Sequence, residues 1–267
     1  MSEPAQGDAW NPDQYARFRA ERSQPFFDLL GLVRARPGMR VVDLGCGTGE
    51  LTAEMHRRLA AREMLGVDSS SAMLAETRAF AGGGVRFEEA DLRRFAARPE
   101  NAAAFDLALS NAALQWVPEQ AAVIEALTGL LAPGGQIAIQ VPSNEDHPSH
   151  LTAREVAAEE PFRSELGGHV RRFSNLPPEG YAALLDRLGY PEQHVRLQVY
   201  VHHLPEREAV VEWVRGSLLT DYQRRLRPEA FDRFLERYRA ALMPRLEERR
   251  PFFYSFKRIL VWGRRDG

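Results

Sequence analysis

The sequence is poor in cysteine, in long apolar runs and in net charge, and each shortage excludes a class of protein. Cys46 is the single cysteine in 267 residues, so no disulfide can form within the chain. No segment approaches the roughly 18 apolar residues of a membrane span. The opening residues, MSEPAQGDAW, lack the basic-then-apolar pattern of a signal peptide. We therefore expect a cytoplasmic protein without a membrane partner.

The charge balance argues against a nucleic-acid partner. Lys and Arg number 35 and Asp and Glu number 37, which gives a formal net charge of −2. Such a chain exerts no general attraction on nucleic acid. The hydrophobic fraction of 44% and the charged fraction of 27% are ordinary for a globular protein. We expect a single domain over residues 1–267, a monomer or weak dimer.

The first half alternates between two hydrophobic patterns. Short apolar runs predict strands at residues 39–45, 64–68, 85–91, 105–111 and 136–142. Helical spacing of apolar residues predicts helices at 50–60, 71–80 and 121–132. Pro133, Gly134 and Gly135 predict a tight turn before the fifth strand. Strand–helix alternation predicts a parallel sheet with helices on both faces.

The second half is less regular. Strands are predicted at residues 196–204 and 256–265, with amphipathic helices at 207–219 and 228–248 between them. We interpret three pieces as a helical cap on the 39–142 cofactor-binding core: an N-terminal segment at 10–34 and insertions at 143–180 and 205–252. The alternative is that these are ordinary packing helices.

Residues 43–49, DLGCGTG, form a glycine-rich loop between a predicted strand and a predicted helix. Glycines permit a sharp turn and a close approach of ligand to backbone. Because ligands of open α/β sheets bind beyond the carboxyl ends of the strands, this loop lies where a cofactor would bind.

A dinucleotide is the competing ligand, and its fingerprint is G-x-G-x-x-G. Here Glu50 stands at the third glycine position and Asp43 precedes the loop. Both carboxylates would repel a pyrophosphate. They favour S-adenosylmethionine, which carries an ammonium group, a positive sulfonium and no phosphate.

Two further acidic residues follow predicted strands. Asp68 lies about 20 residues after the loop, where a carboxylate can accept bonds from both ribose hydroxyls; alone, it could equally be a helix N-cap. Asp91 could accept a hydrogen bond from the adenine amine, or be a solvated loop residue. After the fourth strand, Asn111 could face the transferring methyl group. Trp116 could line the site or simply pack in the core.

Taken as a set, these motifs resemble the class I methyltransferases. The segments concerned are 43–49, Asp68, Ala90–Asp91, Ser110–Asn111 and 131–135. The resemblance implies an α/β, Rossmann-like, seven-stranded mixed sheet of order 3-2-1-4-5-7-6, with strand 7 antiparallel. It also implies S-adenosylmethionine as cofactor.

A closer resemblance covers nearly the whole length. The segments WNPDQYARFRAERSQP, NAALQWVPE, QVPSNEDHPSHLTAREVA, YVHHLPEREAVVEWVRGSLL and FKRILVWGRR are similar to trans-aconitate methyltransferases. Membership of that family implies formation of a methyl ester on one carboxylate of a small tricarboxylate. A carboxylate is ionised at neutral pH and needs no strong base, so the protein must position it and neutralise the acceptor's other charges. Arginine suits that task.

We therefore assign candidate residues to two groups. Cofactor-binding candidates are Tyr15, Arg22, Asp43, Gly45, Cys46, Gly47, Gly49, Asp68, Ser69, Met73, Ala90, Asp91, Leu92, Asn111 and Ala112. Substrate-binding candidates are Trp10, Trp116, His150, Arg154, His202 and Arg258, of which Trp116 and His202 are also candidates for a catalytic role.

Several simpler readings compete with these assignments. Arg154 could be an ordinary surface residue. Lys257 and Arg258 face opposite sides of their strand, so at most one faces a given site. Cys46 reads as a packing residue, and His147 and His150 lack the further ligands of a metal site. We expect no metal.

Two other functions remain open at this point. One is a methyltransferase acting on a carrier-protein-bound acyl group or on a natural-product oxygen or carbon. The other is a cofactor-binding sensor without catalysis, since fold alone does not establish function.

Overall fold

A computed structural model of the chain describes residues 19–171 and 174–267, with side chains from Ser23 onward. Three candidates, Trp10, Tyr15 and the Arg22 side chain, therefore lie outside the described residues.

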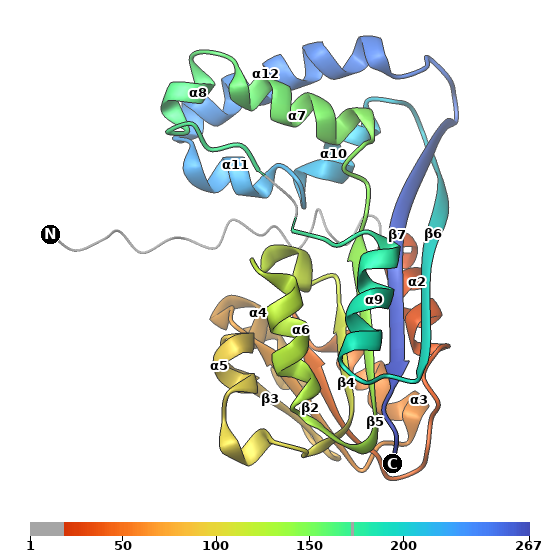
Figure 1. The fold of residues 1–267 in the computed structure, drawn as a ribbon. Coiled ribbons are helices and arrows are strands. Elements are labelled where there is room, and N and C mark those ends of the chain that lie inside the picture. Colours follow the sequence, from red (N-terminus) through yellow and green to blue (C-terminus); the bar gives the residue numbers. More distant parts are fainter. Residues whose placement is uncertain (1–18, 172–173) are drawn as a thin grey trace, which may run out of the picture. The chain divides into compact units, whose positions relative to one another are not determined.

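Seven strands form one sheet in the order β3-β2-β1-β4-β5-β7-β6 (Figure 1). They are β1 (Arg40–Leu44), β2 (Glu63–Asp68), β3 (Val85–Glu89), β4 (Phe105–Asn111), β5 (Leu131–Pro142), β6 (Glu192–Leu204) and β7 (Phe252–Arg264). The β1–β2, β1–β4, β2–β3 and β4–β5 pairs are parallel, whereas β5 and β7 pair antiparallel. The strand order and the antiparallel β7 that the resemblance implied are confirmed.

Along the chain, the helices precede β1 or connect successive strands. The α-helices are α2 (Arg19–Leu30), α3 (Glu50–Leu59), α4 (Ser71–Ala75), α5 (Leu92–Ala96), α6 (Gln120–Thr128), α7 (Pro148–Ala158), α8 (Phe162–Glu165), α9 (Pro178–Arg187), α10 (Ala209–Arg215), α11 (Thr220–Arg225) and α12 (Pro228–Leu242). Short 3-10 helices are η1 (Glu76–Ala79), η2 (Pro99–Asn101), η3 (Leu114–Trp116) and η4 (Met243–Arg245).

The chain divides into two compact units. The larger comprises Ser23–Ser143, Ser174–Gln198 and Lys257–Gly267. The smaller comprises, among the described residues, 19–22, 144–171 and Val199–Phe256. Strands β6 and β7 each contribute residues to both units.

The larger unit has an apolar core on each face of its sheet, because successive side chains of a strand point to opposite faces. On β4, Leu107 packs in one cluster with Phe26 of α2 and residues of α3. Its neighbour Ala108 packs in the other cluster, with Ile124 of α6 and Leu184 of α9. Helices on both faces are thus confirmed.

The smaller unit is helical apart from its strand segments. Helix α7 lies beside α12 (Figure 1). The core is rich in aromatic rings: Phe234 of α12 packs edge-on against Phe162, with ring centroids 5.3 Å apart, and against the tilted ring of Tyr222 at 5.0 Å. Such aromatic pairs stabilise a helical core beyond their burial alone.

The structure corrects some predicted elements. The turn predicted at residues 133–135 lies inside β5, where Gly134 has φ +70° and the pairing with β4 shifts between Phe105 and Leu107. A bulge absorbs the extra residues, so the strand continues through the glycines. The helix predicted at 71–80 changes at Glu76 into the 3-10 helix η1. The insertion predicted at 143–180, for which the sequence defined no individual helix, contains α7 and α8.

Candidate active site

Most cofactor-binding candidates lie at one edge of the larger unit's sheet. Strands β1, β2, β3 and β4 are parallel neighbours and end at Leu44, Asp68, Glu89 and Asn111. The glycine-rich loop, Asp68 itself, Asp91 and Asn111 each end a strand or follow one within a few residues. The fold therefore brings these segments, which are far apart in sequence, to the edge where α/β proteins bind ligands.

The glycine-rich loop has a backbone that only glycine adopts easily. Gly45, Gly47 and Gly49 have φ of +83°, +56° and +80°. A Cβ at Gly45 would lie 2.2 Å from the Cβ of Ala113, whereas a Cβ at Gly47 would meet nothing within 4 Å. Gly45 thus serves the packing of the loop, and the open space at Gly47 suits the approach of a ligand.

Asp68 holds this loop to the end of β2. The Gly47 N–H donates to Asp68 Oδ2 and the Ser70 N–H to Asp68 Oδ1, both at 2.9 Å. Each carboxylate oxygen can accept more than one hydrogen bond, so both can also accept from a ligand hydroxyl. Ser70, rather than Asp68, caps α4, by accepting from the Met73 N–H at 3.2 Å. This answers the N-cap alternative for Asp68.

Asp43 is buried beneath the loop, with 4% of its surface exposed. Thr52 Oγ1 donates to Asp43 Oδ2 at 2.6 Å. Burial raises the pKa of Asp43 to about 6; the Thr52 bond opposes this rise and the nearby Asp68 charge adds to it. An ionised Asp43 therefore makes the edge of the sheet favourable for a cationic group and unfavourable for a phosphate.

Replacing Asp43 with asparagine is expected to stabilise the ligand-free protein at alkaline pH. The raised pKa means that the folded chain holds the proton more tightly, so wild-type stability falls as pH rises from about 4 through 6. A shift of about two units corresponds to an effect on the order of 3 kcal/mol. Urea unfolding at pH 4 to 8 should show the gain of the variant growing with pH. A gain independent of pH would contradict this account.

The neighbouring candidates have simpler roles. Burial raises the pKa of the Cys46 thiol, so it remains protonated and is not a nucleophile. Asp91 is exposed and caps α5, because its Oδ1 accepts from the N–H groups of Arg93 and Arg94. Ala90 and Leu92 on either side are buried. The cap holds Asp91 in place without using its second oxygen.

The end of β4 presents polar groups and an exposed ring. Asn111 Oδ1 is buried and has no hydrogen-bond partner among the described residues. Ala112 has φ +54° and donates its N–H to the Gln140 carbonyl at 2.9 Å. Trp116 is 47% exposed, so it is not a core residue.

Ser69 is exposed and Met73 half-buried near the end of β2.

Arg258 of β7 is a buried cation in the larger unit, 9% exposed. Its Nη1 donates to Gln140 Oε1 at 3.2 Å. Sequence reasoning selected Arg258 and missed Gln140. A signal was present: Gln136 and Gln140 are polar residues in a strand whose other residues are buried and mostly apolar.

In the smaller unit, His150 is buried and neutral. Ser149 N–H donates to His147 Nδ1 at 3.1 Å, so that nitrogen is an acceptor. The Ser149 hydroxyl lies 2.8 Å from His147 Nδ1 and 3.1 Å from His150 Nδ1. A hydroxyl has one proton, so it donates to His147 and accepts from the His150 Nδ1–H. Burial lowers the pKa of His150 to about 3, so His150 supplies no positive charge at neutral pH.

The remaining candidates of this unit are His202, which packs against aromatic rings, and Arg154. His202 is buried, with its ring 4.6 Å from that of Trp213 and 6.4 Å from that of Tyr254. Arg154 Nη2 donates to the Glu145 carbonyl at 3.3 Å. Arg171, which the sequence did not suggest, is 7% exposed and donates to the Ser217 and Leu218 carbonyls. Burial lowers its pKa to about 10, so it remains charged at neutral pH.

Two classes of feature are not found in the described part of the chain. Across residues 19–171 and 174–267, no group of three or more His, Cys, Asp or Glu side chains is placed to hold a metal ion. Within the same residues, no helix is long and apolar enough to cross a membrane.

Comparison with known proteins agrees with this geometry. The family model described as "Methyltransferase domain" matches residues 41–135, which contain the glycine-rich loop, Asp68 and Asn111. Trans-aconitate 2-methyltransferase of Deinococcus radiodurans is 42% identical over 257 residues, covering 94% of this chain and 96% of the relative. The enzyme of that name from Escherichia coli O1:K1 / APEC is 35% identical over 262 residues, covering 96% and 98%.

A solved structure shows the same fold at lower identity. The S-adenosylmethionine dependent methyltransferase of Mesorhizobium loti matches with a TM-score of 0.51 and 23% identity, over 91% of this chain and 98% of that one. Identity of 35–42% over nearly the full length decides the relationship. The chain is a methyltransferase and belongs to the trans-aconitate 2-methyltransferase family.

Proposed function

We propose that the chain transfers a methyl group from S-adenosylmethionine to one carboxylate of a small polycarboxylic acid such as trans-aconitate, forming a methyl ester. The observation that carries this proposal is the near full-length similarity to relatives of that name. The site of the larger unit supports it, because a glycine-rich loop and acidic side chains meet at the carboxyl ends of the strands.

The residues present fit this cofactor. Asp68 would accept from the ribose hydroxyls while its bonds to Gly47 and Ser70 keep it oriented. The backbone of residues 45–49, with open space at Gly47, would hold the amino-acid end, whose ammonium Asp43 attracts. Asp91 would take the adenine amine with the oxygen that the α5 cap does not use. Asp43, Asp68 and Glu50 together make a poor site for a pyrophosphate.

The chemistry places few demands on the protein. When bound, S-adenosylmethionine supplies an electrophilic methyl group on its sulfonium. A carboxylate of the acceptor is already ionised at neutral pH, so no side chain has to remove a proton. The protein contributes by aligning the carboxylate, excluding water and neutralising the acceptor's other negative charges.

Arginines supply that neutralisation. Arg258 is a buried cation on β7, and Arg154 and Arg171 are the cations beside His150. A guanidinium binds a carboxylate through two parallel N–H donors, which fixes orientation as well as charge. The other substrate-binding candidates stay predictions for each unit: Trp116 in the larger unit, and His202 and the neutral His150 in the smaller unit. Trp10, Tyr15 and Arg22 remain predictions outside the described side chains.

The direct test is turnover of a panel of acids. Purified protein with S-adenosylmethionine and trans-aconitate should give S-adenosylhomocysteine and a mono-methyl ester, both measured by mass spectrometry. Other tricarboxylates should react more slowly and monocarboxylates slowest, because fewer charges match the arginines. No turnover of any di- or tricarboxylate would remove the proposal.

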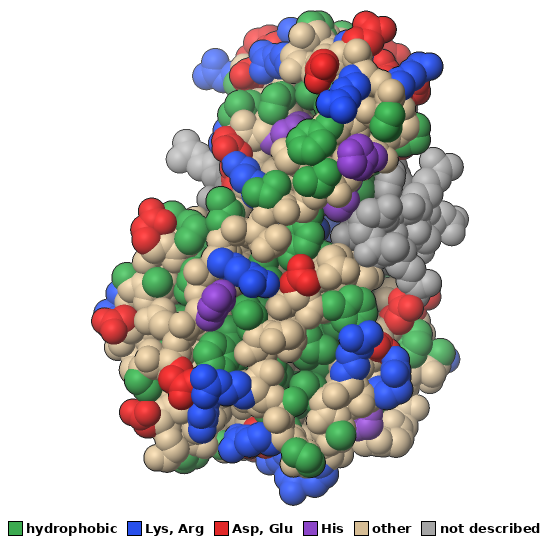
Figure 2. Space-filling model, turned by 90° about the vertical axis from the view of Figure 1, so that its right-hand side faces the viewer, with side chains coloured by type: hydrophobic (Ala, Val, Ile, Leu, Met, Phe, Trp, Pro, Cys, Tyr) green, Lys and Arg blue, Asp and Glu red, His purple; other side chains and the backbone are tan. Residues whose placement is uncertain are grey.

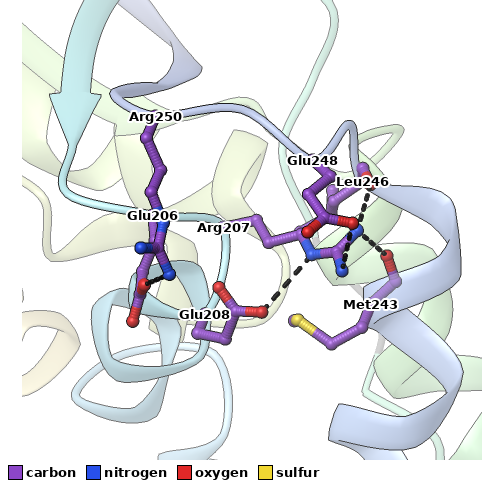
Figure 3. Close-up of polar contacts among 7 residues, drawn as sticks. All are labelled: Glu206, Arg207, Glu208, Met243, Leu246, Glu248 and Arg250. Atoms are coloured by element: carbon purple, nitrogen blue, oxygen red, sulfur yellow. Dashed lines mark hydrogen bonds and ion pairs between the residues drawn. The ribbon is translucent and has the colours of Figure 1, made fainter.

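The alternative acceptor, an acyl group on a carrier protein, would need a basic docking surface for an acidic partner. The segment that follows α12, residues 245–250, does not provide one, because Arg245 and Arg250 pair with glutamates of the smaller unit. Figure 3 shows the Arg250 pair and those of Arg207. Arg250 pairs with Glu206, and Arg207 with Glu208 and Glu248. On the face drawn in Figure 2, basic and acidic side chains are likewise mixed. Turnover of phosphopantetheine thioesters without turnover of free acids would favour this alternative.

We further propose that the protein is a cytoplasmic monomer or weak dimer with no nucleic-acid or membrane partner. The near-neutral charge and the single cysteine support this assignment. Light scattering at micromolar concentration tests the oligomeric state.

A further inference from the structure

Polar side chains from three neighbouring strands share one face at the carboxyl end of β5. Asn111 of β4 and Gln140 of β5 are register partners. Gln140 also pairs with Leu260 of β7, and Arg258 lies two residues before Leu260, on the same face. Apart from Gln136 of β5, the neighbouring positions of β4 and β5 on this face, Leu107, Leu109 and Ala138, belong to an apolar core cluster. These polar residues are therefore concentrated where the sheet meets the candidate site.

Gln136 shows what a purely structural glutamine looks like on the same strand and face. Its Oε1 accepts from Arg34 N–H at 2.8 Å and Trp262 Nε1 at 2.9 Å, and its Nε2 donates to the Arg34 carbonyl at 2.9 Å. Both ends of this amide are satisfied, and it joins the segment after α2 to the sheet. Gln136 and Gln140 are equally buried, each 1% exposed.

Gln140 differs because only one end of its amide is used. A guanidinium has donors only, so the amide atom facing Arg258 must be Oε1. Its Nε2 is buried and has no hydrogen-bond partner among the described residues, and Asn111 Oδ1 on the adjacent strand is in the same condition. Buried polar groups in native proteins are nearly always paired, so these two mark hydrogen bonds that are completed by something further.

We propose that Gln140 is a positioning residue for the acceptor. It holds the Arg258 guanidinium through Oε1, and its own amide N–H completes a subsite for a carboxylate that is not methylated. This inference rests on the proposed function. It predicts that Gln140 and Arg258 act as one unit that selects acceptors with more than one carboxylate. The subsite lies entirely within the larger unit.

The experiment compares Gln140→Leu and Gln140→Glu with Gln136→Leu as the matched control. Calorimetry on the S-adenosylhomocysteine complex gives the acceptor Kd, and initial rates give KM for trans-aconitate and for S-adenosylmethionine. For Gln140→Leu we expect trans-aconitate to bind about 10- to 100-fold more weakly, as for loss of a bond to a charged group. Gln140→Glu should be at least as impaired, because its carboxylate neutralises Arg258. KM for S-adenosylmethionine should change less than about twofold in both.

Gln136→Leu should lower the melting temperature and leave acceptor affinity unchanged. A double-mutant cycle distinguishes this role from a purely structural one. In an Arg258→Ala background, Gln140→Leu should weaken acceptor binding little further. A monocarboxylate, which lacks the second group, should be affected equally little by either Gln140 variant. Gln140 variants that behave like Gln136→Leu would overturn the inference while the proposed function stands. A wild type that neither binds nor methylates polycarboxylates would remove both.

Discussion

Replacement of Asp68 with alanine is expected to weaken the binding of S-adenosylhomocysteine by about 100-fold or more. Two ribose hydroxyl bonds to a charged acceptor contribute about 1.5–3 kcal/mol each, and every 1.4 kcal/mol is a factor of ten. The variant also releases the Gly47 and Ser70 N–H groups, which Asp68 now holds at 2.9 Å, so the loop loses its attachment to β2. Calorimetry with purified protein measures the effect.

Two controls separate ligand contact from damage to the fold. Asp68→Asn keeps one oxygen acceptor and should lose less affinity than the alanine variant. Ser71→Ala, at an exposed position in the first turn of α4, should bind S-adenosylhomocysteine nearly as wild type. Circular dichroism should show all three proteins folded. Unchanged affinity in Asp68→Ala would mean that the carboxylate only ties down the loop and that the ribose assignment is wrong.

The parts of the fold that the sequence predicted well depend on local patterns. Strand–helix alternation and turn residues predicted the cofactor-binding half. The position of Asp43 and Asp68 near the ends of predicted strands made them candidates for the site. These signals work because in a parallel sheet each strand end lies at the same edge, so position along the chain predicts position at the site. The strand order came from the resemblance, and the structure confirms it.

The features that the sequence could not predict depend on contacts between residues that are distant along the chain. The Gln140–Arg258 bond joins residues 118 positions apart and exists only because β7 runs antiparallel beside β5. The neutral state of His150 depends on its burial, which is produced by packing in the folded smaller unit. Similarly, the bulge at Gly134 depends on pairing with β4, so a tight turn was a reasonable but incorrect prediction from the Pro-Gly-Gly sequence.

Replacement of Gly45 with alanine is expected to destabilise the protein strongly, and a second substitution should partly restore it. The new Cβ would lie 2.2 Å from the Ala113 Cβ, and its residue would have φ +83°. Overpacking costs about 1–3 kcal/mol and the left-handed backbone about 1–2 kcal/mol, so a loss of about 2–5 kcal/mol is expected. For a chain of this size each kcal/mol lowers Tm by about 2–4 °C.

The rescue follows from the contact itself. Ala113→Gly removes the colliding methyl, so the double variant should recover about 1–3 kcal/mol, the overpacking part, and retain the backbone strain. Gly47→Ala is the matched comparison, because its Cβ would meet nothing within 4 Å although its φ is +56°. That variant should lose only about 1–2 kcal/mol of stability through backbone strain, and so melt within a few degrees of wild type. It should nevertheless bind S-adenosylhomocysteine poorly, since the added methyl occupies the side of the loop left open to the cofactor. Equal loss of stability in the two single variants would show that the Ala113 contact does not distinguish Gly45, and normal cofactor affinity in Gly47→Ala would place the ligand elsewhere.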